Sequence, residues 1–163
     1  MDFKPYHTAG FSIIEILTVM VLMSALAVLI IPNMYNSYLS IATTSAVNQV
    51  VRDIKYAEEY ALAKRDTVWV EFDVPGNRYS IYHGDKVVDK ALLENTHGDG
   101  NFVIQLGEGE YQKISLSSAD FDGSPNLIVD KFGIPILTNN GTVVINSTFT
   151  ITVAAGIGTV TLQ

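Results

Sequence analysis

An uninterrupted apolar run near the N-terminus constrains this chain more than any other feature. Residues 11–31 read FSIIEILTVMVLMSALAVLII, with a single charged side chain, Glu15. At about 1.5 Å per residue, a helix of this length extends roughly 31 Å, which matches the roughly 30 Å hydrocarbon core of a bilayer. Lys4 precedes the run and the next basic residue is Arg52. The positive-inside rule therefore predicts a single-pass span, with the N-terminus in the cytoplasm and the bulk of the chain outside.

A secretory signal peptide is the alternative explanation of such a run. Signal peptides have an apolar core of about 7–15 residues, followed by a cleavage site of small residues. The run in this chain is longer, and the sequence IPNMYNSYL that follows it offers no such site. The sequence therefore favours a span that the mature chain keeps.

Length and composition limit the size of the fold and the classes of partner that the chain can have. The chain has 163 residues, a formal net charge of −7 and a pI of about 4.7. This length suffices for one modest domain and one long appended element. The acidic balance argues against nucleic acid or anionic lipid as the main partner. There are no cysteines, which excludes disulfides and thiolate metal sites.

Glu15 is the unusual residue within the apolar run. An isolated carboxylate at mid-bilayer costs on the order of 2.5–3.5 kcal/mol, so charged residues in spans are rare and usually have a partner. The alternative is a glutamate that reaches the membrane interface without a partner, although glutamate lacks the long stem that lysine and arginine use for this purpose.

The residues around Glu15 resemble a known motif. Gly10-Phe11-Ser12-Ile13-Ile14-Glu15, between a short polar leader and the apolar run, is similar to the cleavage motif of type IV prepilins, which usually has Thr and Leu where Ser12 and Ile13 stand. The resemblance implies that a membrane-embedded prepilin peptidase cuts between Gly10 and Phe11 and methylates the new amine of Phe11. It also implies that Glu15 pairs with the N-terminal amine of a neighbouring subunit. Pro32 stands where pilins commonly have a helix-bending proline.

Helical periodicity continues beyond the apolar run. Apolar residues recur every three or four positions from Val47 to Ala61, at 47, 50, 51, 54, 57 and 61. Charged residues lie mainly off this stripe, namely Asp53, Lys55, Glu58, Glu59 and Lys64. We predict one helix from about residue 11 to residue 65. The expected organisation is a leader over 1–10, a transmembrane and assembly half over 11–31, an amphipathic half over 32–65 and a β-rich globular domain over 66–163.

The pattern changes to alternation after residue 66. Apolar and polar residues alternate over 68–73, Pro75-Gly76-Asn77 predicts a turn, and 78–82 returns as the second strand of a hairpin. Further strands are expected over 101–106, 112–116, 126–130, 142–146, 148–154 and 158–162, while 84–100 is ambiguous. The predicted fold class is α+β, a long N-terminal helix packed on a mostly antiparallel β-sheet domain.

Two further segments sharpen the resemblance. The helix end over residues 57–65 leads directly into the hairpin at Val68, and Phe132-Gly133-Ile134-Pro135 forms a turn before the last strands. Among pilin-like proteins, this arrangement is most similar to the minor pseudopilin H and FimT group.

One loop is a candidate for calcium. Asp120, Asp122 and Asn126 supply closely spaced oxygen atoms around Gly123, which suits this ion. Asx and proline turns explain the same residues. No other cofactor is expected, and no nucleophile, base and acid stand at recognisable catalytic spacing, so we do not expect an enzyme.

The sequence therefore predicts a structural subunit, most simply a minor one, of a type II secretion pseudopilus or type IV pilus. Its expected partners are other pilins or pseudopilins, the prepilin peptidase and the inner-membrane assembly platform. It is expected in the bacterial inner membrane with a periplasmic globular domain, and in a filament once assembled. The alternative is a minor pilin that takes up DNA. That role needs a basic surface, whereas after residue 91 only Lys113 and Lys131 oppose seven acidic residues.

Overall fold

The computed structural model describes residues 10–84, 89–94 and 100–162, with the side chains of 29–36 and 110 excepted. The predicted leader therefore lies outside the described residues, apart from Gly10. The chain divides into two compact units, Met1–Leu39 and Ser40–Gln163, and a single helix, α1 (Ile13–Lys64), contributes to both. We call the second unit the globular body.

Helix α1 begins and ends close to the predicted positions. At its start, the Ser12 carbonyl accepts hydrogen bonds from the backbone N–H groups of Glu15 and Ile16, at 3.0 and 3.2 Å. At its end, Arg65 adopts a left-handed conformation with φ 55°, and the N–H of Asp66 donates to the Ala61 carbonyl. Arg65 therefore caps the helix in the left-handed conformation that glycine usually adopts at this position.

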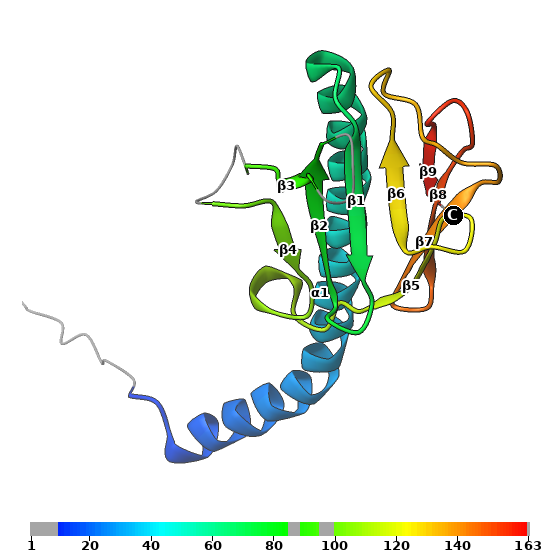
Figure 1. The fold of residues 1–163 in the computed structure, drawn as a ribbon. Helices are drawn as coiled ribbons and strands as arrows, with labels where there is room; N and C mark the ends of the chain where they lie inside the picture. Colours follow the sequence, from blue (N-terminus) through cyan, green and yellow to red (C-terminus); the bar gives the residue numbers. More distant parts are fainter. Residues whose placement is uncertain (1–9, 85–88, 95–99, 163) are drawn as a thin grey trace, which may run out of the picture. The chain divides into compact units, whose positions relative to one another are not determined.

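Within the described residues, nine strands form two antiparallel sheets in the globular body (Figure 1). The first sheet has the order β3-β2-β1-β6, with β4 also paired to β2, and the second has the order β5-β7-β8-β9. The bounds of the first sheet's strands are β1 Val68–Asp73, β2 Arg78–His83, β3 Ala91–Leu92, β4 Val103–Gln105 and β6 Asn126–Val129. Those of the second are β5 Leu116–Asp120, β7 Gly141–Ile145, β8 Phe149–Val153 and β9 Val160–Leu162.

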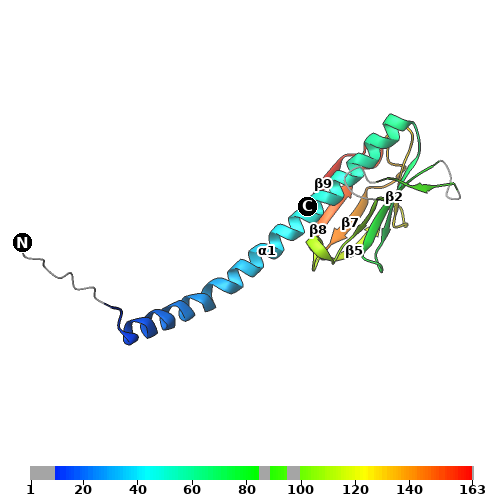
Figure 2. The same cartoon turned by 90° about the vertical axis from the view of Figure 1, so that its left-hand side faces the viewer.

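The part of α1 that belongs to the globular body packs against the sheets (Figure 2). The residues that it buries repeat at helical spacing, as the sequence predicted, and they are Ala42, Ala46, Val47, Val50, Ile54, Ala57 and Ala61. Alternate residues of β1 and β2 face the same core, including Val68, Val70, Phe72, Tyr79 and Ile81. The α+β class and the helix packed on antiparallel sheets are therefore confirmed.

The predicted hairpin is confirmed residue by residue. Strands β1 and β2 pair from Val68 opposite His83 to Asp73 opposite Arg78. The Asp73 carboxylate closes the turn, accepting from the Gly76 N–H at 3.0 Å and from Nε of Arg78 at 2.9 Å.

The strand predicted over 112–116 is wrong, because the observed strand β5 runs from Leu116 to Asp120. Side chains take the backbone hydrogen bonds that a strand would use there. Asn77 donates from Nδ2 to the Ile114 carbonyl at 2.9 Å and accepts at Oδ1 from the Leu116 N–H at 2.7 Å. Asn146 Oδ1 accepts from the Ser115 N–H at 2.7 Å. Strand β3 also arises in the segment that the sequence left ambiguous.

Asp53 is a second correction, because it lies inside the core rather than off the buried stripe. It is only 5% exposed, and its Oδ2 accepts from the Tyr79 hydroxyl at 2.5 Å. Its Oδ1 accepts from Nε2 of Gln49, one helical turn earlier, at 2.8 Å. Burial, followed by the Asp53 carboxylate, raises the pKa of Tyr79 well above its ordinary value, which keeps the phenol a donor.

Candidate functional site

The junction between Gly10 and Phe11 is exposed. Gly10 is exposed, and within the described residues a Cβ atom built on it would meet nothing within 4 Å. Packing within the described part of the chain therefore does not require glycine at residue 10.

The first half of α1 is apolar on all sides and exposed on all sides. Within residues 11–28 the large apolar side chains are between 48% and 80% exposed, including Ile13, Leu17, Val21 and Val28. A helix that is apolar all round is one that an apolar environment or other helices surround. No helix within the described residues is long and apolar enough to cross a membrane.

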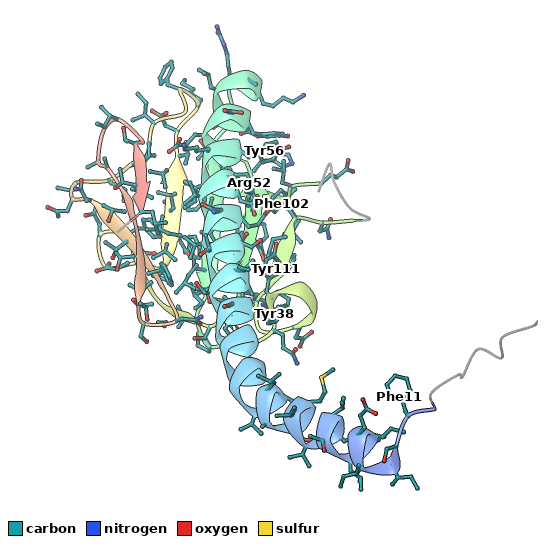
Figure 3. The ribbon with its side chains drawn as sticks, turned by 180° about the vertical axis from the view of Figure 1, so that it is seen from behind. Phe11, Tyr38, Arg52, Tyr56, Phe102 and Tyr111 are labelled. Carbon is teal, nitrogen blue, oxygen red and sulfur yellow. The ribbon has the colours of Figure 1, made fainter. Side chains whose placement is uncertain are left out.

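Phe11 and Glu15 come together on one side of this segment. They line a shallow hollow with Ile16, Val19 and Met20, and Figure 3 shows Phe11 where the helix begins. Glu15 lies in the first turn of α1, where a negative charge interacts favourably with the helix dipole. The Glu15 side chain thus lines the same hollow as Phe11, the residue whose amine a cut after Gly10 would release.

The helix is continuous across Pro32. Residues on both sides of it are helical, from Ile13 to Lys64. A bend at this residue stays a prediction.

The candidate calcium residues lie where the chain passes from one sheet to the other. Asp120 ends β5, Asn126 begins β6, and Asp122 lies between them. Asp120 Oδ1 accepts from the Gly123 N–H at 2.7 Å. The Asp122 carboxylate accepts from the N–H groups of Thr138 and Asn139, at 2.6 and 3.1 Å, and these bonds lower its pKa. Within the described ranges, no group of three or more acidic, histidine or cysteine side chains is placed to hold a metal ion.

The same connection anchors the two sheets through an aromatic side chain. Phe121 is buried and its ring centroid lies 5.7 Å from that of Phe72 in β1. A Cβ atom on Gly141 would stand 2.1 Å from the Phe121 ring, so that position has room only for glycine. Binding of calcium at this loop stays a prediction.

Sequence reasoning missed Glu58, which it treated as a solvated helix residue. Its Oε1 is buried without a hydrogen-bond partner in the described part of the chain. Burial raises its pKa from 4.5 to about 7, Lys55 lowers it and Glu59 raises it further. The sequence around Glu58, nearly two turns before the helix end, does not reveal this environment, because loops distant in the sequence create it.

The N-terminal helix is apolar in its first half and packed on antiparallel sheets in its second. No family model and no curated protein matches this sequence. Two solved structures of the minor pseudopilin EpsH, from the type 2 secretion system of Vibrio cholerae, resemble the chain with a TM-score of 0.55 each. They are 15% and 16% identical to it, and the alignments cover 75% of this chain and 95% and 93% of theirs. The chain therefore has a pseudopilin fold.

Proposed function

We propose that this chain is a structural subunit, most simply a minor one, of a type II secretion pseudopilus or a type IV pilus. The observation that carries the proposal is the pseudopilin fold attached to an exposed, apolar helical segment. Its role is to bind neighbouring subunits rather than to catalyse a reaction. Because the EpsH structures come from a type 2 secretion system, the secretion pseudopilus is the favoured filament.

Maturation begins with cleavage between Gly10 and Phe11 and methylation of the new amine. The exposed glycine, free of any packing role, supports recognition by a prepilin peptidase. Residues 11–31 then anchor the chain in the inner membrane, with the globular body in the periplasm. Assembly moves the apolar helices out of lipid and against each other, at the assembly platform.

Glu15 gives this assembly its axial register. A carboxylate in an apolar environment is stabilised when a cation offsets its lost hydration, and the Phe11 amine of a neighbouring subunit supplies that cation. The pair forms only when two helices are correctly staggered. Apolar packing thus provides attraction between the helices, and the ion pair selects one alignment.

The test combines cleavage and assembly in one set of variants. After coexpression with a prepilin peptidase, intact-mass measurement should show the loss of residues 1–10 and the gain of one methyl group. Glu15→Ala should be cleaved and inserted normally, yet its cross-linking to partner pilins should fall at least about tenfold, since the ion pair is lost. Thr18→Val is the matched control, because it also makes the helix more apolar but keeps the carboxylate. A mature chain that starts beyond Ile31 would overturn the proposal.

A further inference from the structure

The C-terminal end of α1 carries an exposed apolar surface on the globular body. Four side chains, which we call the end surface, form it: Leu62, Phe132, Ile134 and Ile157, which are 59%, 62%, 41% and 76% exposed. Leu62 belongs to the helix, Phe132 and Ile134 to the turn between β6 and β7, and Ile157 to the loop between β8 and β9 (Figure 1).

Two glycines allow these three segments to meet. A Cβ atom on Gly133 would stand 2.8 Å from the Glu58 carbonyl oxygen and 3.3 Å from Cβ of Leu62. A Cβ atom on Gly158 would stand 2.8 Å from Oε1 of Glu58 and 3.1 Å from Cδ of Pro135. Both glycines also have positive φ angles, 76° and 65°, which other residues rarely adopt. The turn and the loop therefore close over the helix at Glu58.

The Glu58 carboxyl group lacks a compensating charge from the segments that cover it. From Phe132 to the C-terminus the sequence has no charged residue. In the turn, Asp130 Oδ1 accepts from the N–H groups of Phe132 and Ile134, and Nζ of Lys131 lies 5.5 Å from the centroid of the Phe132 ring. On α1 itself, Lys55 and Glu59 act on Glu58 with opposite signs. A cation that reaches the charged carboxyl group would stabilise it.

We propose that the end surface binds a helix of another filament subunit, one that presents a lysine or arginine among aliphatic side chains, and that this cation pairs with Glu58. Charge complementarity selects this partner, because the surface is apolar around a single half-buried acid. Aliphatic side chains around the pair exclude water, which strengthens the attraction between the two charges. The proposal rests on the proposed function for the class of partner.

Such binding is linked to protonation. A cation beside Glu58 favours its charged form, so the partner displaces a proton wherever the free carboxyl group is protonated. Since the pKa of Glu58 is raised to about 7, affinity should increase between pH 6 and pH 8.

The test uses the full-length chain in phosphatidylcholine nanodiscs and a fluorescent, synthetic amphipathic helix made of leucine and lysine. Fluorescence anisotropy should show binding that is tighter at pH 8 than at pH 6, after subtraction of binding to empty nanodiscs. Glu58→Gln should weaken binding about tenfold and remove its pH dependence, whereas Glu59→Gln should change it less than about twofold.

A second pair of variants tests the apolar part of the surface. Phe132→Ser should weaken binding about tenfold, and Ile41→Ser, at a residue 70% exposed elsewhere on the globular body, should not. Equal losses for Glu58→Gln and Glu59→Gln would overturn the proposal, since they would mean general attraction to an acidic protein. Equal effects of Phe132→Ser and Ile41→Ser would overturn it too. Cleavage after Gly10 is measured independently, so failure here and failure of the proposed function are distinguishable.

Discussion

The two halves of α1 share one secondary structure and differ in what surrounds their apolar side chains. Between Ile13 and Val28, large apolar residues are exposed all round the helix. Between Ala42 and Ala61, the buried residues keep to one stripe against the sheets. The second half thus has its apolar partner within the chain, whereas the first half must obtain one from lipid or from other helices. One helix therefore carries both a stripe that the folded body buries and an apolar surface that the chain leaves exposed.

Matched isoleucine substitutions test this difference directly and should show the largest effect. Ile54 is 0% exposed and Ile14 is 68% exposed on the same helix. Ile54→Ala should lower the free energy of unfolding of the globular body by about 2–5 kcal/mol, because it leaves a cavity in the core. Ile14→Ala should lower it by less than about 0.5 kcal/mol. Urea denaturation of the full chain in detergent, followed by the fluorescence of Trp69, measures both; equal losses would contradict the comparison.

The pH dependence of stability tests how far the second half of α1 buries Glu58. The pKa of Glu58 is raised from 4.5 to about 7, so the folded state binds more protons than the unfolded state in this window. Stability should therefore fall as pH rises from 4.5 to 7. At pH 8, Glu58→Gln should stabilise the fold by about 1–2 kcal/mol, after allowance for solvent screening of a half-buried group.

At pH 4 the stabilising effect of Glu58→Gln should vanish, since the native carboxyl group is then neutral as well. Glu59→Gln is the matched control and should change stability by less than about 0.5 kcal/mol at either pH. Thermal denaturation monitored by circular dichroism separates these outcomes. A wild-type stability that increases from pH 4.5 to pH 7 in step with the Glu58 carboxyl group would contradict this assignment.

Removal of the first unit should have the smallest effect. Among the residues that the structure describes, all the buried apolar residues of the core belong to 42–153. Deleting residues 1–39 should therefore leave a folded, soluble, β-rich protein, whose free energy of unfolding differs from that of the full chain by less than about 1 kcal/mol. Circular dichroism and urea denaturation measure this. An unfolded fragment would mean that the first half of α1 contributes to the core.

Local patterns predicted most of this fold. The apolar stripe from Val47 to Ala61 identified the buried face of α1, and alternation around Pro75-Gly76-Asn77 identified the hairpin. The strand predicted over 112–116 is wrong for a different reason. The side chains of Asn77 and Asn146, which are distant in the sequence, form hydrogen bonds with the backbone of this segment. When distant side chains form the hydrogen bonds of a backbone segment, the segment's own sequence shows no alternation or helical periodicity that would reveal them.

Some residues of the candidate site could likewise be predicted from a local sequence pattern, and others could not. Gly10, Phe11 and Glu15 form a contiguous motif, so their interpretation needed only the printed sequence, and their roles stay predictions. Asp53 and Glu58 resemble ordinary helix-surface residues, and only the partners brought by the fold distinguish them. Tyr79 makes Asp53 a satisfied core residue, whereas the loops at Gly133 and Gly158 cover Glu58 without giving Oε1 a hydrogen bond.

The hydrogen bond between Asp53 and Tyr79 has a mechanical consequence. It joins α1 to β2 inside the core, across residues that are far apart in the sequence. A force applied along α1 therefore reaches the sheet through this bond and the side chains packed around it, rather than only through the short link that follows Lys64. Tension on the N-terminal segment would be distributed over many helix–sheet contacts at once. The globular body would therefore move together with α1 and would not unfold stepwise from one end.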